Sequence, residues 1–410
     1  MKRFNALSTY LVVLAVSSFA KRLIFTINGV YKVQAAGLNP LQLVLLGTVL
    51  EIAIFLFEVP TGVVADVYSR RLSMAIGFAL IGTGFVIEGS FPSFLPILVA
   101  QIFWGVGFTF TSGATEAWIA DEVGEGRAAD AYLRGTQWAA VGALIGAPVS
   151  ALIATQVLNL PILLGGGLII LLCPLILLFA PETGFKPILR EERGSWRALW
   201  DTFSGGLGLV RRQPALRWFF AAALFVGLYS EPVDRLREAH FLENFTLPPL
   251  AGFEPVIWFG VLGVVSTLLT IIATWATRRL VNVAKGRVLL VGLAINLAGV
   301  AGTLLVWAFS RNFALALAAY WSLTLMRSLA EPLDTAWVNQ RVDSQVRATV
   351  FSMRSLTDAA GQLSGGPVLG WIGTIFGVRA ALAVAAFVLA PAVPIYLRLA
   401  GWRGQNERAS

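Results

Sequence analysis

Charged side chains inside apolar segments are the groups in this sequence that could do chemistry. Residues 227–240 read GLYSEPVDRLREAH and continue a strongly apolar segment that begins near Leu216. Glu231, Asp234 and Arg235 therefore lie in a segment suited to a lipid bilayer, where a central charge costs roughly 2.5–3.5 kcal/mol. Carboxylates and guanidiniums in such a place bind protons, ions or charged solutes, unless they are permanent structural ion pairs.

A pattern of paired carboxylates occurs twice. SEPVDR at 230–235 recurs as AEPLDT at 330–335, each with a proline that favours a kink. Residues three apart lie near one face of a helix, so we expect Glu231 with Asp234, and Glu331 with Asp334, to share a face. Such pairs at opposite ends of a bundle suggest salt bridges that alternate between partners; permanent ion pairs are the competing interpretation. Glu231, Asp234 and Glu331 are therefore proton-coupling candidates.

Glu116 is the fourth and sharpest proton-coupling candidate. It stands in SGATEAW, among small residues. Apolar surroundings favour the neutral form of a carboxyl group, which suits a residue that must both load and release a proton. A structural ion pair with Arg134 or another cytoplasmic base is the competing interpretation, and both stay open on the sequence alone.

Composition shows that membrane helices must hold these charges. Of 410 residues, 57% are hydrophobic and 13% charged, against about 25% charged in soluble domains. Apolar runs long enough to cross roughly 30 Å of hydrocarbon recur along the whole chain. We predict an all-α integral membrane protein with twelve transmembrane helices, at about 7–30, 40–63, 73–91, 95–119, 131–156, 159–180, 215–238, 255–277, 287–309, 313–335, 348–374 and 378–399.

Basic residues gather in alternate loops. Arg70 and Arg71 follow the second span, and many more occupy residues 181–214, whereas the opposite loops hold little beyond Lys32, Arg311 and Arg379. Positive charge marks cytoplasmic loops, so we expect a multi-pass protein of the inner or plasma membrane with both termini in the cytoplasm. The net charge of +8 then reflects topology, and we expect no nucleic-acid partner.

The chain divides into two similar halves. We predict an N-terminal six-helix bundle at 1–180, a cytoplasmic linker at 181–214 and a C-terminal six-helix bundle at 215–410. TEAWIADEV at 115–123 matches DTAWVNQRV at 334–342, and further matches follow in the same order. Parallel six-helix repeats joined by a linker are a known transporter plan.

The segment GVVADVYSRR at 62–71 resembles the loop signature of the major facilitator superfamily. Gly62, Asp66, Arg70 and Arg71 match it, while two other positions of the signature are replaced. The resemblance implies a gating role, in which Gly62 lets helices approach and Asp66 pairs with Arg70 or Arg71, or caps a helix of the other half. Solvated loop charges are the alternative.

In that family the first, fourth, seventh and tenth spans line a central cavity, and here those spans carry most intramembrane charge. The resemblance therefore implies cavity or substrate roles for polar, charged and aromatic residues of these spans: Arg22, Gln101, Trp104, Thr111, Tyr229, Arg235, Arg327 and Asp334. Arg22 and Arg327 offer forked donors for an anionic group, or they balance acidic neighbours. GALIGAP at 142–148 resembles the family's antiporter motif, with its proline one place late.

These features predict a secondary active transporter that works by alternating access. We expect proton-coupled efflux of small amphiphilic organic compounds, as in drug:proton antiporters, with sodium as the alternative coupling ion. An importer, or a lipid or organic-anion transporter of the same fold, is the alternative, and a non-transporting receptor is a distant one. Because nucleophile, zinc and phosphate-loop motifs are absent from the sequence, we expect no enzyme activity, no metal and no cofactor. We expect a monomer whose partners are a small-molecule substrate, protons and the lipid bilayer.

Overall fold

The computed structural model describes residues 5–187, 214–250, 252–281, 286–342 and 344–401. Most of the predicted linker, residues 188–213, lies outside them. Each predicted span coincides with one helix or with two consecutive helices. Ten helical segments in the described part are long and apolar enough to cross a membrane. The helices at the seventh and eleventh spans are not among the ten, and both carry several charged residues. The predicted all-α membrane fold is confirmed.

The chain forms two compact units. The first contains residues 1–38, 49–196 and 248–264, and the second contains 39–48, 197–247 and 265–410. Residues 39–48 and 248–264 group with the half opposite to their place in the sequence, which the predicted boundaries did not include.

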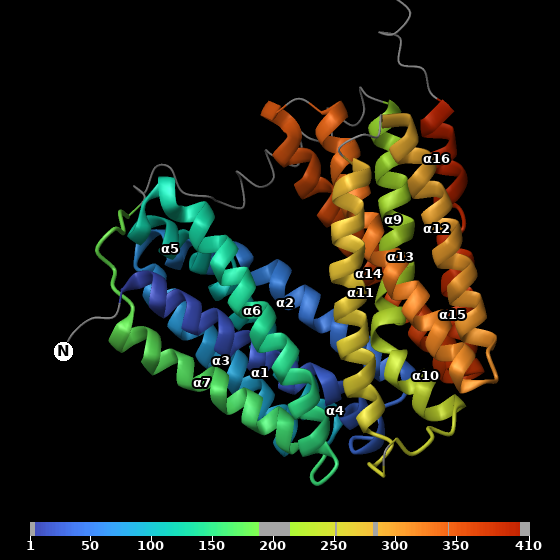
Figure 1. The fold of residues 1–410 in the computed structure, drawn as a ribbon, viewed down its shortest axis with the longest axis horizontal. Coiled ribbons are helices and arrows are strands. Elements are labelled where there is room, and N and C mark those ends of the chain that lie inside the picture. Colours follow the sequence, from blue (N-terminus) through green and yellow to red (C-terminus); the bar gives the residue numbers. More distant parts are fainter. Residues whose placement is uncertain (1–4, 188–213, 251, 282–285, 343, 402–410) are drawn as a thin grey trace, which may run out of the picture. The chain divides into compact units, whose positions relative to one another are not determined.

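The first unit is built around two central helices. α1 (Ala6–Gln34) packs against α6 (Glu125–Ala154) and α7 (Leu160–Phe179), and α3 (Arg70–Ser90) packs against α4 (Phe94–Thr111) and α7 (Figure 1). α2 is Pro40–Val67 and α5 is Ala114–Val123. Gly113, with a φ of 70°, separates α4 from α5 inside the predicted fourth span. Glycine adopts this left-handed conformation without strain.

The second unit repeats this packing. Its helices are α9 (Pro214–Arg235), α10 (Arg237–Asn244), α11 (Ile257–Val281, split between the units), α12 (Gly286–Phe309), α13 (Phe313–Arg341), α14 (Ser344–Phe376), α15 (Val378–Leu389) and α16 (Ala392–Gly401). α9 packs against α14, α15 and α16, as α1 does against α6 and α7. α12 packs against α13, α15 and α16, as α3 does against α4 and α7. The two halves that resemble each other in sequence therefore also have corresponding helix–helix contacts.

Glycines make the closest helix contacts of both units. A Cβ on Gly142 or Gly146 of α6 would collide with the backbone of α1. A Cβ on Gly361 or Gly365 of α14 would collide with the backbone of α9. Both pairs are spaced four apart, the spacing that lets two helix backbones approach closely in membranes.

The two prolines of the paired-carboxylate pattern differ in effect. Three residues after Pro232, α9 ends at Arg235, and α10 begins at Arg237. By contrast, α13 continues past Pro332 to Arg341. The break after α9 places Arg237 and Glu238 in a new helix, beside the last turn of α9.

Candidate functional site

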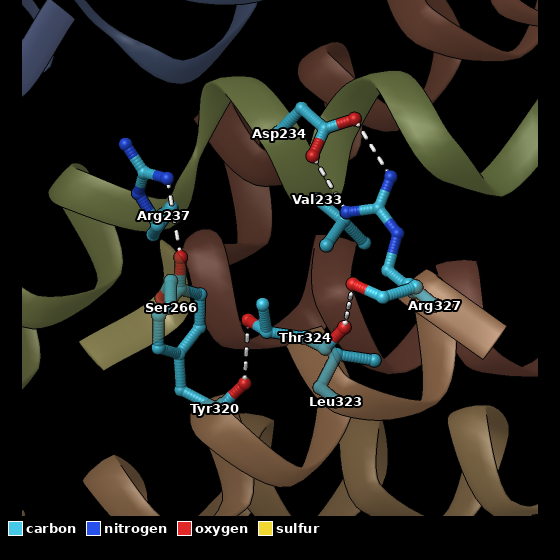
Figure 2. Close-up of a pocket in the computed structure, with 9 residues that line it drawn as sticks. Val233, Asp234, Arg237, Ser266, Tyr320, Leu323, Thr324 and Arg327 are labelled. Carbon is cyan, nitrogen blue, oxygen red and sulfur yellow. Dashed lines mark hydrogen bonds and ion pairs between the residues drawn. The ribbon is translucent and has the colours of Figure 1, made fainter. Parts of the chain in front are cut away.

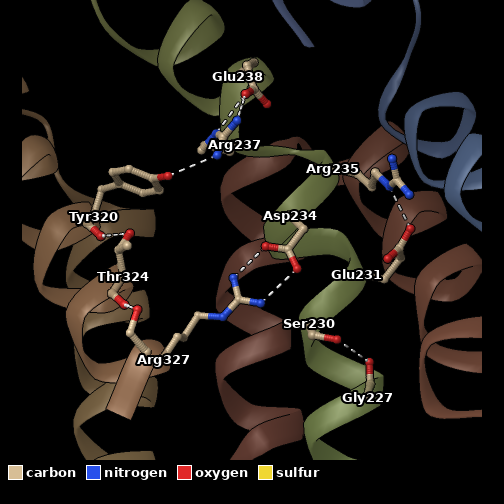
Figure 3. A network of polar contacts seen from close by, with 11 residues as sticks. Gly227, Ser230, Glu231, Asp234, Arg235, Arg237, Glu238, Tyr320, Thr324 and Arg327 are labelled. Atoms are coloured by element: carbon tan, nitrogen blue, oxygen red, sulfur yellow. Dashed lines mark hydrogen bonds and ion pairs between the residues drawn. The ribbon is translucent and has the colours of Figure 1, made fainter. Parts of the chain in front are cut away.

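Asp234 of α9 and Arg327 of α13 form a two-pronged ion pair in the second unit. The Arg327 Nη1 donates to Asp234 Oδ1 at 2.6 Å, and Nη2 donates to Oδ2 at 2.8 Å (Figure 3). Paired N–H groups facing both carboxylate oxygens give the strongest and most directional ion-pair geometry. The Arg327 side chain is 29% exposed and the Asp234 side chain 53% exposed. Water and solutes therefore have access to this ion pair.

A cavity of about 380 Å³ lies beside this pair. Its walls come from α9, α10, α11 and α13 (Figure 2). Polar side chains dominate the lining, which consists of Val233, Asp234, Arg237, Ser266, Tyr320, Leu323, Thr324, Arg327 and Ser328. We call this cavity the C-unit pocket. Its volume is near the lower end of the range for small-molecule sites.

Arg237 forms the opposite wall of the C-unit pocket. Its Nε donates to Glu238 at 2.8 Å, and its Nη1 donates to the Tyr320 hydroxyl oxygen at 3.1 Å. Tyr320 is therefore an acceptor for Arg237, which leaves its own hydroxyl proton for another acceptor. Figure 2 shows Arg237 and Tyr320 on one side of the pocket and the Asp234–Arg327 pair on the other.

Hydroxyl groups complete the lining. Thr324 donates to the Tyr320 carbonyl at 3.0 Å, and Ser328 donates to the Thr324 carbonyl at 2.9 Å, so both hydroxyl oxygens keep acceptor capacity. The Ser266 hydroxyl oxygen is buried and has no hydrogen-bond partner among the described residues. The aromatic ring of Tyr229 lies 5.8 Å from the Arg327 guanidinium carbon, within cation–π range.

Glu231 and Asp234 do not share a partner or a side of α9, so the expected common face is wrong. Glu231 accepts from Arg235 at 2.8 Å and is 6% exposed. Figure 3 shows this pair turned away from Asp234 and Arg327. Residues three apart differ by about 60° around a helix, and here each carboxylate turns toward a different arginine. Gly47 of α2 lies against the Glu231–Arg235 pair.

The second pair of carboxylates also separates. Asp334 is 4% exposed, accepts from the Tyr396 hydroxyl at 3.0 Å and forms an ion pair with Arg354. Glu331 is exposed. The sequence prediction named Asp334 but missed both partners, which come from α14 and α16. Asp334 therefore ties three helices of the second unit together.

Glu116 lies on the surface of the first unit. Its side chain is exposed, so the apolar surroundings expected from its small neighbours are absent. The break at Gly113 starts α5 and puts Glu116 in its first turn, beside the buried Ala114 and Thr115. Arg134 pairs with Asp130 at 2.9 Å, so it is not the expected partner of Glu116. Another base, Lys21, lies within electrostatic range of Glu116.

Gln101 belongs to a buried cluster that the sequence prediction missed. Glu88, fully buried, accepts from Gln101 at 3.0 Å and from the Asn28 amide, and it pairs with Lys32 at 3.1 Å. Tyr31 donates to the Glu88 carbonyl at 2.8 Å. The cluster joins α1, α3 and α4, and it neutralises one of the few basic residues expected outside the cytoplasm.

The other cavity candidates of the first unit have local partners. Trp104 stacks near Phe25 and Phe85, with ring centroids 5.0 and 5.3 Å away. The Thr111 hydroxyl donates to the Phe108 carbonyl at 2.9 Å. Arg22 is half-buried.

The gating residues contact different partners from those expected. Arg70 pairs with Asp121 of α5 at 2.8 Å, and Arg71 approaches Glu182 at 3.8 Å while its backbone N–H donates to the same carboxylate. The expected pairing of Asp66 with Arg70 or Arg71 is therefore not what the structure shows, and Asp66 is half-buried. A Cβ on Gly62 would meet no atom within 4 Å, so no close helix contact occurs there.

Comparisons with known proteins agree with this architecture. Residues 10–351 match the family described as the Major Facilitator Superfamily. A Bacillus subtilis (strain 168) protein named "Uncharacterized MFS-type transporter YxaM" is 24% identical over 361 residues, 86% of each chain.

Solved structures of transporters show the same fold. The nucleoside transporter NupG superposes with a TM-score of 0.78 at 13% identity, covering 98% of this chain and 100% of NupG. A bacterial homolog of the human lysosomal transporter Spinster, in an inward-facing and unoccupied conformation, gives a TM-score of 0.73 at 13% identity. That match covers 97% of this chain and 96% of the homolog.

Proposed function

The chain belongs to the Major Facilitator Superfamily of membrane transporters, and on that premise we propose a proton-coupled secondary transporter in which Asp234 and Arg327 link proton binding to solute binding. It is a multi-pass membrane protein. From the loop charges we propose an inner or plasma membrane location with both termini in the cytoplasm. Alternating access between two similar halves is the mode of transport we infer from the family plan.

The observation that carries the proposal is the accessible two-pronged ion pair at the wall of the C-unit pocket. Arginine keeps its charge at all physiological pH values, so the aspartate alone can change charge. When Asp234 takes a proton, its hold on Arg327 weakens, and the guanidinium becomes available to a solute in the pocket. Proton binding and solute binding then share one pair of side chains.

The other carboxylates are weaker candidates for this role. Glu231 is buried in a pair outside the C-unit pocket, so its protonation would not change the pocket lining directly. Glu116 and Glu331 are not among the residues that line the C-unit pocket. We keep all three as alternative proton sites, which the experiment below separates from Asp234.

For gating, we propose that Arg70 and Arg71 act through Asp121 and Glu182. These contacts join the first turn of α3 to α5 and to the segment after α7. Breaking and remaking such charge-assisted contacts costs little net free energy when they are partly exposed. They suit a contact that changes during a transport cycle.

The charged and hydroxyl groups of the C-unit pocket favour a solute with polar groups, while apolar atoms supply about half of the lining surface. Efflux of amphiphilic compounds remains a second candidate because GALIGAP at 142–148 resembles the family's antiporter motif. The close packing of Gly142 and Gly146 on α1 is expected of any GxxxG pair and does not by itself support efflux.

The test uses purified protein in liposomes with an imposed pH gradient and an internal pH dye. Organic anions, neutral polar compounds and lipophilic cations are added in turn to wild type, Asp234→Asn and Glu116→Gln. We expect at least one compound to collapse the gradient in wild type and Glu116→Gln but not in Asp234→Asn. Collapse that persists in Asp234→Asn would move the proton site to Glu116, Glu231 or Glu331. No coupled flux with any compound would contradict proton coupling.

A further inference from the structure

We infer that the C-unit pocket binds a small hydroxylated organic anion together with a proton. This inference rests on the proposed function, because it names the class of solute that the Asp234–Arg327 pair would handle. It adds a chemical identity to the site, and it predicts that the solute and the proton move in the same direction.

The first argument is the surplus of donors in the pocket. Nη1 and Nη2 of Arg327 each make one hydrogen bond, to Asp234, so N–H groups remain on this guanidinium. Arg237 likewise keeps an N–H beyond its bonds to Glu238 and Tyr320. The Tyr320 hydroxyl proton and the Ser266 hydroxyl add two neutral donors. The donors lie on both sides of the pocket, an arrangement that suits carboxylate or phosphate oxygens.

The acceptors in the lining suit hydroxyl groups on the solute. Thr324 has donated its proton to a backbone carbonyl, so its oxygen accepts from a ligand. Ser328 has also donated to a carbonyl and shares a hydrogen bond of 3.1 Å with the Thr270 hydroxyl, which leaves its oxygen one acceptor site at most. They follow one another along α13, on the same wall as Tyr320. An acid group held by the guanidiniums and hydroxyls held by these oxygens would use the whole polar lining.

The second argument is the charge around Asp234. Arg327 and Tyr320 face it from α13, Arg235 and Tyr229 belong to its own helix, and Arg237 and Glu238 lie on α10. Glu231, also on α9, pairs with Arg235. α14 contributes a further carboxylate, Asp358, within electrostatic range of Asp234, Arg327 and Arg354. Asp358 accepts from Gln362 at 2.8 Å.

While Asp234 is ionised, its carboxylate occupies two N–H groups of Arg327, so an entering anion would compete with Asp234 for the same guanidinium. A proton on Asp234 removes one negative charge and releases Arg327 for the anion. The anion and the proton therefore bind together, and transport couples them in one direction. In a membrane that holds an inward proton gradient, this coupling drives uptake.

The third argument is size. About 380 Å³ lies near the lower end of the range of about 300–1,000 Å³ for small-molecule pockets, which favours the smaller ligands of that range. A lipid with a long acyl chain would need an apolar extension, and the lining supplies only Val233 and Leu323 as apolar side chains. Among the anions considered from the sequence, a short organic acid therefore fits better than a lysolipid.

The experiment measures binding directly, without a pH gradient. Purified full-length protein is titrated with lactate, glycerate, gluconate and glycerol 3-phosphate. The neutral comparisons are lactamide, glyceramide, gluconamide and glycerol, and ethanolamine represents cations. Binding is followed by thermal stabilisation and tryptophan fluorescence, at acidic and at neutral pH. Variants are Arg327→Gln, Asp234→Asn and, as a matched control, Asp130→Asn, which alters an exposed Asp–Arg pair outside the pocket.

We expect at least one anion to bind tenfold or more tightly than its neutral analogue, and more tightly at acidic than at neutral pH. Arg327→Gln abolishes this preference, Asp234→Asn keeps it but removes its pH dependence, and Asp130→Asn leaves both unchanged. If Arg327→Gln unfolds, the double variant Asp234→Asn/Arg327→Gln, which keeps the pair neutral, must lose the preference.

Equal or tighter binding of an amide or of ethanolamine, or no binding of any anion at millimolar concentration, overturns the inference. The proposed function fails separately. Proton-coupled flux of cations or neutral compounds alone would support the proposed function but overturn the inference of an anionic solute. Anion binding without coupled proton flux would support the anionic solute but contradict the proposed function.

Discussion

The buried pair of Lys32 and Glu88 makes the most quantitative prediction about this protein. Glu88 is 0% exposed and Lys32 5% exposed. Their charged atoms are 3.1 Å apart, which corresponds to an attraction of about 5 kcal/mol at an effective dielectric constant of about 20. The cost of removing both charges from water offsets much of this attraction, so the pair contributes little net stability. Each charge would nevertheless be unpaired and buried without the other.

Glu88→Leu removes the carboxylate and leaves a buried ammonium, together with two amide donors from Asn28 and Gln101, without this acceptor. Breaking one side of a buried pair costs about 3–5 kcal/mol. Lys32→Met/Glu88→Leu removes both charges, and we expect it to lie near wild type, or up to a few kcal/mol above it, since apolar replacement of buried pairs is often neutral or stabilising.

The assay is thermal unfolding of the detergent-purified protein, with wild type, both single variants and the double variant measured side by side. The double-mutant cycle gives the coupling energy between the two positions. We expect at least about 3 kcal/mol, because each single substitution uncovers the charge of the other. Single variants as stable as wild type, or a double variant as unstable as the sum of both, would refute the reasoning.

Three further predictions concern stability. Gly142→Ala puts a Cβ into the backbone of α1 and lowers stability by about 1–3 kcal/mol, whereas Gly167→Ala, in open space, does not; thermal unfolding of both checks this, and equal effects would contradict it. Glu182→Ala removes the carboxylate that accepts from the Arg71 backbone N–H and the Ser69 hydroxyl, and we expect it to lower stability by about 1–3 kcal/mol. Glu182→Gln keeps an acceptor oxygen without the charge, so it would lose no stability if the charge were irrelevant. Tyr396→Phe removes the hydroxyl bound to Asp334 and costs about 1.5–3 kcal/mol; unchanged unfolding would show that this bond adds nothing.

The sequence predicts the helices of this fold well, because a segment in lipid must satisfy all its backbone groups internally and apolar length therefore reports a helix. It also predicts the repeat, since Trp118 and Trp337 occupy equivalent buried places in the two units. It misses the breaks at Gly113 and Leu236. A glycine or a proline in a membrane helix can be tolerated or can interrupt the helix, and the contacts with neighbouring helices determine the outcome.

The partners of the charged residues were harder to predict. Asp234 and Arg327 were both named, but their pairing joins positions 93 residues apart. Membrane helices are apolar on all sides, so the pattern does not reveal which face turns inward. Gln101 was assigned to the cavity for its position in the fourth span, yet it faces Glu88. Asp358 was not named at all, although a lone carboxylate in the eleventh span was a usable signal.

The most direct test of the central claim is the uptake of protons when solute binds. Purified protein in weakly buffered solution is mixed with whichever compound the binding panel identifies, and the change in pH is recorded for wild type and Asp234→Asn. The account predicts about one proton taken up per bound solute in wild type and none in Asp234→Asn, because linked sites exchange free energy in both directions. Equal proton uptake by both proteins, or none by wild type, would contradict the role of the Asp234–Arg327 pair.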